Sequence, residues 1–204
     1  MGRRNDHTRE EIKELAVNAA EEIVIEQGYQ GLSTRKVATA IGYTVGSLYL
    51  VFKNLDELIL HVNLRTLEKM MVEIGEVAQE NRDNPEECIL QLGLAYLKFA
   101  TDHHNRWRML FDHHLAANSE IPDWYDQRIK GLFHVAEVPL QAFNPGQSAD
   151  SYAHSARALW SAIHGICILA MPDKLNIVQA GAPTDLIRTM IHTYLAGELA
   201  LSKQ

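Results

Sequence analysis

Residues 32–53 read LSTRKVATAIGYTVGSLYLVFK and decide the fold. A polar start at Ser33 and Thr34 is followed by apolar residues at helical spacing, and Gly42 then interrupts the pattern. Beyond Thr44, a possible cap, a second helical pattern follows within three or four residues, carried by Val45, Leu48, Tyr49 and Phe52. Two short helices joined by a tight glycine turn predict a helix-turn-helix, with its second helix over about 45–51.

The charge of this region favours a polyanion as partner. Between residues 28 and 55 the charged side chains are Arg35, Lys36 and Lys53, all basic, in a chain whose net charge is −7. The acidic pI of about 5.8 argues against indiscriminate coating of nucleic acid. A local basic patch therefore indicates a sequence-specific DNA-binding protein.

Over roughly residues 8–60 the sequence resembles the DNA-binding domain of the TetR family of bacterial transcriptional repressors. The resemblance is carried by Thr34-Arg35-Lys36-Val37-Ala38, Gly42, Gly46-Ser47-Leu48-Tyr49, Phe52 and Leu58. It implies DNA contacts at Thr34, Arg35, Thr44, Ser47, Tyr49 and Lys53. Family members usually carry a lysine two residues after Lys53, where this chain has Leu55, so Lys53 itself is expected to supply the missing phosphate contact.

The second helix of the motif is the expected recognition helix. Its spacing turns Leu48 and Phe52 to the core and leaves the amino end, from Thr44 through Val45 and Gly46 to Ser47, exposed for base edges. Some of these positions have a second interpretation. Thr34 suits a phosphate contact and a plain helix cap, Gly46 suits close approach to DNA and a tight packing contact, and Tyr49 suits a phosphate contact and a buried ring.

The segments on either side support this motif. Thr8 and Glu11 fit a capping box that starts a helix ending at Gly28, and the acidic outer face of that helix would repel phosphate. The preceding basic arm, residues 1–7, is either a disordered terminus or an arm that reaches a minor groove. A fourth helix, capped by Asn54 and running to about Val77, links the two expected domains: a DNA-binding domain over 1–53 and a helical effector-binding and dimerisation domain over 54–204.

From Pro85 onward every recognisable period is helical, so the fold class is all-α. Pro139 is expected to kink or stop its helix. Aromatic side chains with polar tips among these helices suit a small apolar effector and equally suit a core. The candidate pocket residues are Tyr96, Phe99, Trp107, Phe111, Trp124, Trp160 and His164. The Trp160-to-Gly165 run also resembles a Trp…His-Gly signature of ligand domains in one TetR subgroup.

A homodimer is expected through the last two helices, 151–170 and 184–201, because both are apolar on more than one face. One short recognition helix also reads few base pairs, so two copies on a near-palindrome are needed. The family dimerises in the same way.

Other functional classes lack their signals. Neither cysteine belongs to a metal-binding spacing, and adjacent histidines on a helix diverge, so no metal and no cofactor are expected. Catalytic motifs are also missing, which argues against an enzyme. The polar amino terminus and the lack of a long apolar run indicate a cytoplasmic protein that does not span a membrane.

The resulting hypothesis is a homodimeric repressor that binds a palindromic operator and is released by a small-molecule effector. An activator of the same fold, or a helical ligand-binding or interaction module without DNA binding, are the alternatives. The sequence does not identify the effector, the operator or the regulated genes.

Overall fold

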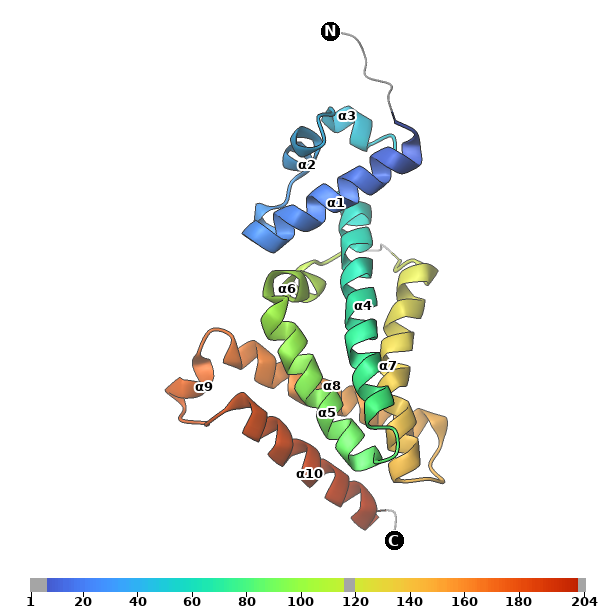
Figure 1. Ribbon diagram of the computed structural model, residues 1–204, viewed down its shortest axis with the longest axis vertical. Coiled ribbons are helices and arrows are strands. Elements are labelled where there is room, and N and C mark those ends of the chain that lie inside the picture. The colour runs from blue at the N-terminus through green and yellow to red at the C-terminus, as the bar shows by residue number, and fades with distance from the viewer. Residues whose placement is uncertain (1–6, 116–119, 202–204) are drawn as a thin grey trace. The chain divides into compact units, whose positions relative to one another are not determined.

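The computed structural model describes residues 7–115 and 120–201, and these residues form ten α-helices and one short 3-10 helix without a β-strand (Figure 1). The expected all-α fold is confirmed. Residues 1–6, most of the basic arm, lie outside the described residues. The elements are α1 (Arg9–Gln27), η1 (Tyr29–Gly31), α2 (Thr34–Ala40), α3 (Val45–Leu48), α4 (Leu55–Glu80), α5 (Pro85–Asp102), α6 (His104–Asp112), α7 (Asp123–Phe143), α8 (Ala149–Ala170), α9 (Lys174–Ile177) and α10 (Pro183–Leu201).

The ends of α1 follow the local signals in the sequence. The backbone N–H of Glu11 donates to the Thr8 hydroxyl over 3.2 Å, and the backbone N–H of Thr8 donates to the Glu11 carboxylate over 2.6 Å. These two bonds form the expected capping box, and the backbone bond from Thr8 lowers the pKa of Glu11. Gly28, at a φ of +71°, ends the helix in a conformation that favours glycine.

The helix-turn-helix forms where the sequence predicts it, but its second helix is shorter. Ser33 caps α2, so Thr34 is the first residue of this helix and is not its cap, contrary to one of its two interpretations. Gly42 turns the chain at a φ of +72°, and Thr44 caps α3. Whereas α3 was expected to run to about residue 51, it ends at Leu48. The backbone beyond it tightens into bonds three residues apart, from Leu50 N–H to Ser47 C=O and from Val51 N–H to Leu48 C=O, which is a common way for a helix to end.

The chain divides into two compact units, and each is described by itself. The first unit comprises residues 1–68 and 103–125, and the second comprises residues 69–102 and 126–204. The boundaries of the compact units therefore differ from the functional boundary expected at residue 53. The chain passes from the first unit to the second within α4, returns at α6, and leaves again near the start of α7.

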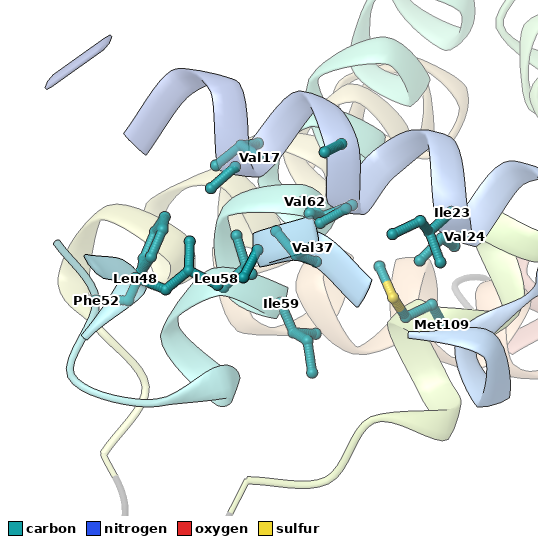
Figure 2. Packing of buried hydrophobic residues seen from close by; sticks show 14 residues of the cluster. Val17, Ile23, Val24, Val37, Leu48, Phe52, Leu58, Ile59, Val62 and Met109 are labelled. Atoms are coloured by element: carbon teal, nitrogen blue, oxygen red, sulfur yellow. The ribbon is translucent and has the colours of Figure 1, made fainter. Parts of the chain in front are cut away.

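A single apolar cluster holds the first unit together (Figure 2). Val17 of α1, Val37 of α2 and Leu48 of α3 are all buried in it, together with Val62 of α4. Figure 2 also shows Met109 of α6 beside Ile23 and Val24 of α1. Because Met109 is fully buried there, α6 is part of the core that supports the helix-turn-helix.

In the second unit α5, α8 and α10 pack against one another. Gly93 of α5 lies where all three helices meet. A β-carbon at this position would lie 2.8 Å from Ile191 Cδ1 and 3.2 Å from Ile163 Cδ1, so glycine permits the close contact. The fully buried Ile187 and Leu195 of α10 complete this core.

Two features of the second unit differ from the expectation. Pro139 is buried inside α7, and the helix continues to Phe143, so the proline does not stop it. A proline removes one backbone hydrogen bond, which the packing of the remaining turns offsets. No local signal predicted α9, a single turn that follows Asp173 in the left-handed conformation.

Candidate nucleic-acid interface

At the amino end of α3, Thr44 and Gly46 are exposed, whereas Val45 and Ser47, which were also expected to be exposed, are half-buried. The backbone N–H of Ser47 donates to the Thr44 hydroxyl over 3.2 Å, and the two hydroxyl groups lie 3.0 Å apart. Leu48 and Phe52 are buried, as expected, so they anchor the helix while Thr44 and Gly46 face outward. This arrangement presents hydroxyl groups and free backbone amides to a partner.

Gly46 and Tyr49 each had two interpretations, and their surroundings favour one. A β-carbon on Gly46 would meet only the Thr44 hydroxyl oxygen, at an ordinary 3.7 Å, so tight packing does not explain the glycine. Tyr49 is 51% exposed, so it is not the buried tyrosine of the alternative interpretation. Val45 is half-buried and packs against the core of the first unit.

The basic side chains of the motif lie at the surface. Arg35 follows Thr34 in the first turn of α2 and is exposed, and Lys53 is exposed just before α4. Lys53 is held at its backbone, where its N–H donates to the Glu57 carboxylate over 2.6 Å. Leu55, at the position where the family usually has lysine, is partly buried against the core.

One contact near the motif carries no sequence signal. Nδ1 of His7 lies 2.7 Å from the hydroxyl oxygen of Tyr43, the residue that immediately precedes the α3 cap. The two residues are 36 positions apart and follow no recognisable pattern. The contact ties the start of α1 to the turn of the helix-turn-helix.

The seven candidate pocket residues fall into both units. Tyr96, Phe99, Trp160 and His164 belong to the second unit. The Tyr96 hydroxyl lies 3.0 Å from His164 Nδ1, and the Trp160 ring is 5.3 Å from the His164 ring. Partial burial lowers the pKa of His164, so its neutral form is favoured. Phe99 is fully buried and is a core residue of this unit.

The other three, Trp107, Phe111 and Trp124, lie in the first unit. Trp107 is completely buried and packs edge-on against Phe111, with ring centres 5.3 Å apart. The Trp124 ring stacks on His61, at 4.9 Å and an interplanar angle of 10°. Burial, followed by the charge of Lys13, lowers the pKa of His61.

The first unit contains a buried polar pair formed by Asn63 and by Tyr125, the residue that follows Trp124. The Asn63 amide hydrogen-bonds the hydroxyl of Tyr125, and burial raises the pKa of Tyr125 to about 12. The carbonyl oxygen of the Asn63 side chain is buried without a hydrogen-bond partner among the described residues. Such an oxygen costs free energy of about 1–3 kcal/mol.

Within residues 7–115 and 120–201, no three His, Cys, Asp or Glu side chains come together as metal ligands would. None of the helices in this part of the chain is long and apolar enough to cross a bilayer.

Comparison with known proteins agrees with this geometry. Residues 16–62 match the family model described as bacterial regulatory proteins of the tetR family, and residues 89–194 match the model of the tetracyclin repressor-like C-terminal domain. An HTH-type transcriptional regulator of Mycobacterium tuberculosis is 24% identical over 177 residues, which cover 86% of this chain and 78% of that protein.

Solved structures share the fold at low sequence identity. A protein from Rhodococcus sp. RHA1 has a TM-score of 0.73 at 16% identity, over 96% of this chain and 98% of that one. The TetR family regulator PfmR from Thermus thermophilus has a TM-score of 0.59 at 16% identity, over 89% and 97%. The regulator FadR from Bacillus subtilis, solved in complex with stearoyl-CoA, has a TM-score of 0.64 at 18% identity, over 90% and 98%. With both its amino-terminal and carboxy-terminal regions matched by family models, the chain belongs to the TetR family of transcriptional regulators.

Proposed function

We propose that this TetR family regulator is a cytoplasmic repressor that binds a palindromic operator and leaves it when a small molecule binds. The observation that carries the proposal is the amino end of α3, where Thr44 and Gly46 are exposed within a stretch whose charged side chains are all basic. Base edges in a major groove are read by such helix ends.

The DNA-binding surface comprises the side chains and backbone of α2, α3 and the residue before α4. Phosphates are held by Arg35, Lys53 and the hydroxyls of Thr34 and Tyr49, and bases by the amino end of α3. In full, the proposed contacts are Thr34, Arg35, Thr44, Val45, Gly46, Ser47, Tyr49 and Lys53. The DNA-binding function is assigned to residues 1–53, and effector binding and dimerisation to residues 54–204.

Dimerisation is assigned to α8 and α10. Both helices carry exposed apolar side chains, among them Leu169 and Leu199. Nothing lies within 4 Å of where a β-carbon on Gly165 or Gly197 would be, so the backbone of each helix can be approached closely. Two such subunits place two recognition helices on half-sites whose centres are separated by multiples of about 34–36 Å.

The effector is assigned to the helices of the C-terminal region, with the pair formed by Tyr96 and His164 as polar contacts beside Trp160. A ligand-bound structure of a protein with this fold, FadR with stearoyl-CoA, supports a ligand-binding role. The effector must favour the arrangement that does not bind DNA. A coupling of about 1–3 kcal/mol would lower operator affinity about 5- to 150-fold.

A salt titration of DNA binding tests the proposal. The probe is the promoter fragment upstream of the protein's own reading frame, compared with a scrambled duplex of equal length. Each phosphate contact adds about 0.9 to the slope of log affinity against log salt. Arg35→Ala and Lys53→Ala should each reduce the slope by about 1, whereas Lys130→Ala, an exposed lysine of α7, should leave it unchanged.

Equal and weak binding of the wild-type protein to both duplexes would refute the DNA-binding function. A reporter gene under the same promoter separates a repressor from an activator. Deleting a repressor raises reporter expression, whereas deleting an activator lowers it. An effector that changes expression without changing operator affinity would contradict release as the mechanism.

A further inference from the structure

A cluster of charges in the first unit joins α1 to α4 and α6. The guanidinium of Arg65, on α4, donates to Asn18 Oδ1 over 2.6 Å and to Glu21 Oε2 over 2.8 Å, and it also pairs with Glu14. The guanidinium of Arg106, on α6, lies 2.7 Å from Glu21 Oε1. Each oxygen of the Glu21 carboxylate therefore bonds a different arginine.

The centre of this cluster is largely removed from solvent. The side chains of Arg106 and Glu21 are 11% and 17% exposed, and that of Arg65 is 25% exposed. Ion pairs at such positions are screened less by water and salt than surface pairs, and removing one partner leaves the other charge uncompensated. The three side chains consequently constrain where α1 can lie on α4 and α6.

Two further bonds support the cluster from α6. Nε of Arg106 donates to the Thr66 hydroxyl of α4 over 3.3 Å, so this arginine contacts two helices at once. The side-chain amide of Asn105 donates to the backbone carbonyl of Ile25 near the end of α1 over 2.9 Å. The carboxyl-terminal half of α1 is thus held by adjacent residues of α6.

The position of α1 affects the recognition helix directly. α1 packs against both α2 and α3. Val17 of α1 shares the buried cluster with Val37 of α2 and Leu48 of α3 (Figure 2). A shift of α1 would therefore change the direction of α3, although none of the charged residues of the cluster belongs to the proposed DNA contacts.

We propose that Glu21, Arg65 and Arg106 are positioning residues for DNA binding, which hold α1, and through it α3, in the orientation that fits the operator. This inference rests on the proposed function. It assigns a role to an acidic residue on a helix whose acidic face was expected only to repel phosphate.

The sign of one substitution separates positioning from simple electrostatics. Glu21→Gln removes a negative charge, so a purely electrostatic view expects DNA to bind more tightly. If Glu21 positions α1, the same change weakens binding. Glu22, the next residue of the same helix, is exposed, and Glu22→Gln makes the same change of charge away from the cluster.

The experiment measures affinity for the promoter fragment and for the scrambled duplex with the full-length wild type, Glu21→Gln and Glu22→Gln. Binding is measured well below the melting temperature, with circular dichroism confirming that each variant is folded. Glu21→Gln should bind the promoter at least about 10-fold more weakly, which is about 1.4 kcal/mol. Its salt slope should stay unchanged, because no phosphate contact is lost. Glu22→Gln should bind as tightly as the wild type or slightly more tightly.

Arg65→Lys provides a second variant that keeps the net charge. Lysine lacks the planar fork that lets one guanidinium bond several acceptors, so promoter affinity should fall although the charge is retained. This variant decides the question if Glu21→Gln is unfolded at the assay temperature. The double variant Glu21→Gln/Arg106→Met should lose less affinity than the two single losses combined, because both act through one contact.

Promoter affinity of Glu21→Gln equal to or above that of Glu22→Gln would overturn the inference, as would wild-type affinity in folded Arg65→Lys. The proposed function fails in a different way, since the wild type itself would then not distinguish the promoter from the scrambled duplex.

Discussion

The two units differ in how their charged groups are used. In the first unit, ion pairs join helices that are far apart in the sequence, as between Glu21 and both Arg65 and Arg106, in addition to the Arg108–Asp112 pair within α6. In the second unit, several pairs lie within one helix, four residues apart; they are Lys69–Glu73, Lys98–Asp102 and Lys130–Asp126. Pairs of this kind on an exposed helix surface contribute little to stability, because solvent screens them.

The second unit instead obtains its helix contacts from apolar packing, as around Gly93. Its pairs between helices, Arg157–Glu137 and His192–Glu86, are more exposed than the Glu21 cluster. Directional bonds fix the angle between helices, whereas apolar contacts tolerate small shifts. The comparison indicates that helix orientation is specified most strictly in the unit that carries the helix-turn-helix.

The largest expected effect is at Trp107 of α6, whose ring is completely buried. Trp107→Ala should lower the free energy of unfolding by about 3–5 kcal/mol, because it removes a completely buried ring. Trp160→Ala, at a half-buried site in the second unit, should cost less. Urea denaturation of both variants measures the difference. Equal losses would show that the buried Trp107 ring contributes no more to stability than the half-buried Trp160 ring.

Overpacking at Gly93 tests the second unit. Gly93→Leu should cost at the upper end of about 1–3 kcal/mol, because the added side chain meets three isoleucines of α8 and α10. Gly75→Leu, on α4, is the matched control, since nothing lies within 4 Å of where its β-carbon would be. The midpoint temperature of thermal unfolding should fall for Gly93→Leu and stay unchanged for Gly75→Leu. A Gly93→Leu variant as stable as the control would show that the three helices can move apart to admit the leucine without loss of stability.

The buried pair of Asn63 and Tyr125 tests how much the polar contacts of the first unit contribute. Asn63→Leu should destabilise by about 1–3 kcal/mol, because it leaves the Tyr125 hydroxyl without its donor. Asn63→Leu/Tyr125→Phe should recover most of that loss, since it removes both polar groups and the unpartnered Asn63 oxygen. The denaturant midpoints of the single and the double variant measure this loss and its recovery. A double variant less stable than the single one would contradict this account.

The smallest expected effect is a pH dependence shared by both units. The pKa values of His61 and His164 are lowered in the folded protein, so below about pH 6.5 the unfolded chain binds protons that the folded chain does not. Stability should therefore be fully present above about pH 6.5 and fall as the pH drops below it. His61→Gln and His164→Gln should each make this fall less steep in urea titrations at pH 7.5 and 5.5.

Salt separates the two histidines. Burial alone lowers the pKa of His164. At His61 the charge of Lys13 adds to burial and outweighs the opposing charge of Glu57, and Arg65 adds a smaller lowering. Added salt screens these charges, so it should reduce the pH dependence that His61 contributes and leave that of His164 unchanged. Equal salt effects in the two variants would contradict these assigned causes.

Local sequence signals predicted the first four helices well. The Thr8–Glu11 capping box, Gly28, Ser33 and Thr44 all act within a few residues, so each can be recognised without knowing the fold. The end of α3 was missed because the spacing of Leu48 and Phe52 is compatible with a continued helix as well as with the tighter turn that forms.

Contacts between distant residues could not be predicted in this way. The pattern of Trp107 and Phe111 predicts a helix but does not say which partner it packs on, so no local feature indicates that α6 shares a compact unit with α1. Glu21 has no local feature that distinguishes it from Glu22, and its partners lie more than 40 residues away. The exposure of Thr44 and Gly46 at the α3 amino end agrees with the predicted site, while each individual DNA contact stays a prediction.

The return of the chain to the first unit has a consequence for synthesis. The 34 residues from Lys69 to Asp102 are made between the helix-turn-helix and α6. At about 5–20 residues per second, their translation alone takes roughly 2–7 s. During this interval the nascent motif lacks Met109 and Arg106, so part of its apolar cluster and one of the two partners of Glu21 are missing. A newly made chain can therefore complete its first compact unit only after α5, a helix of the second unit, has been synthesised.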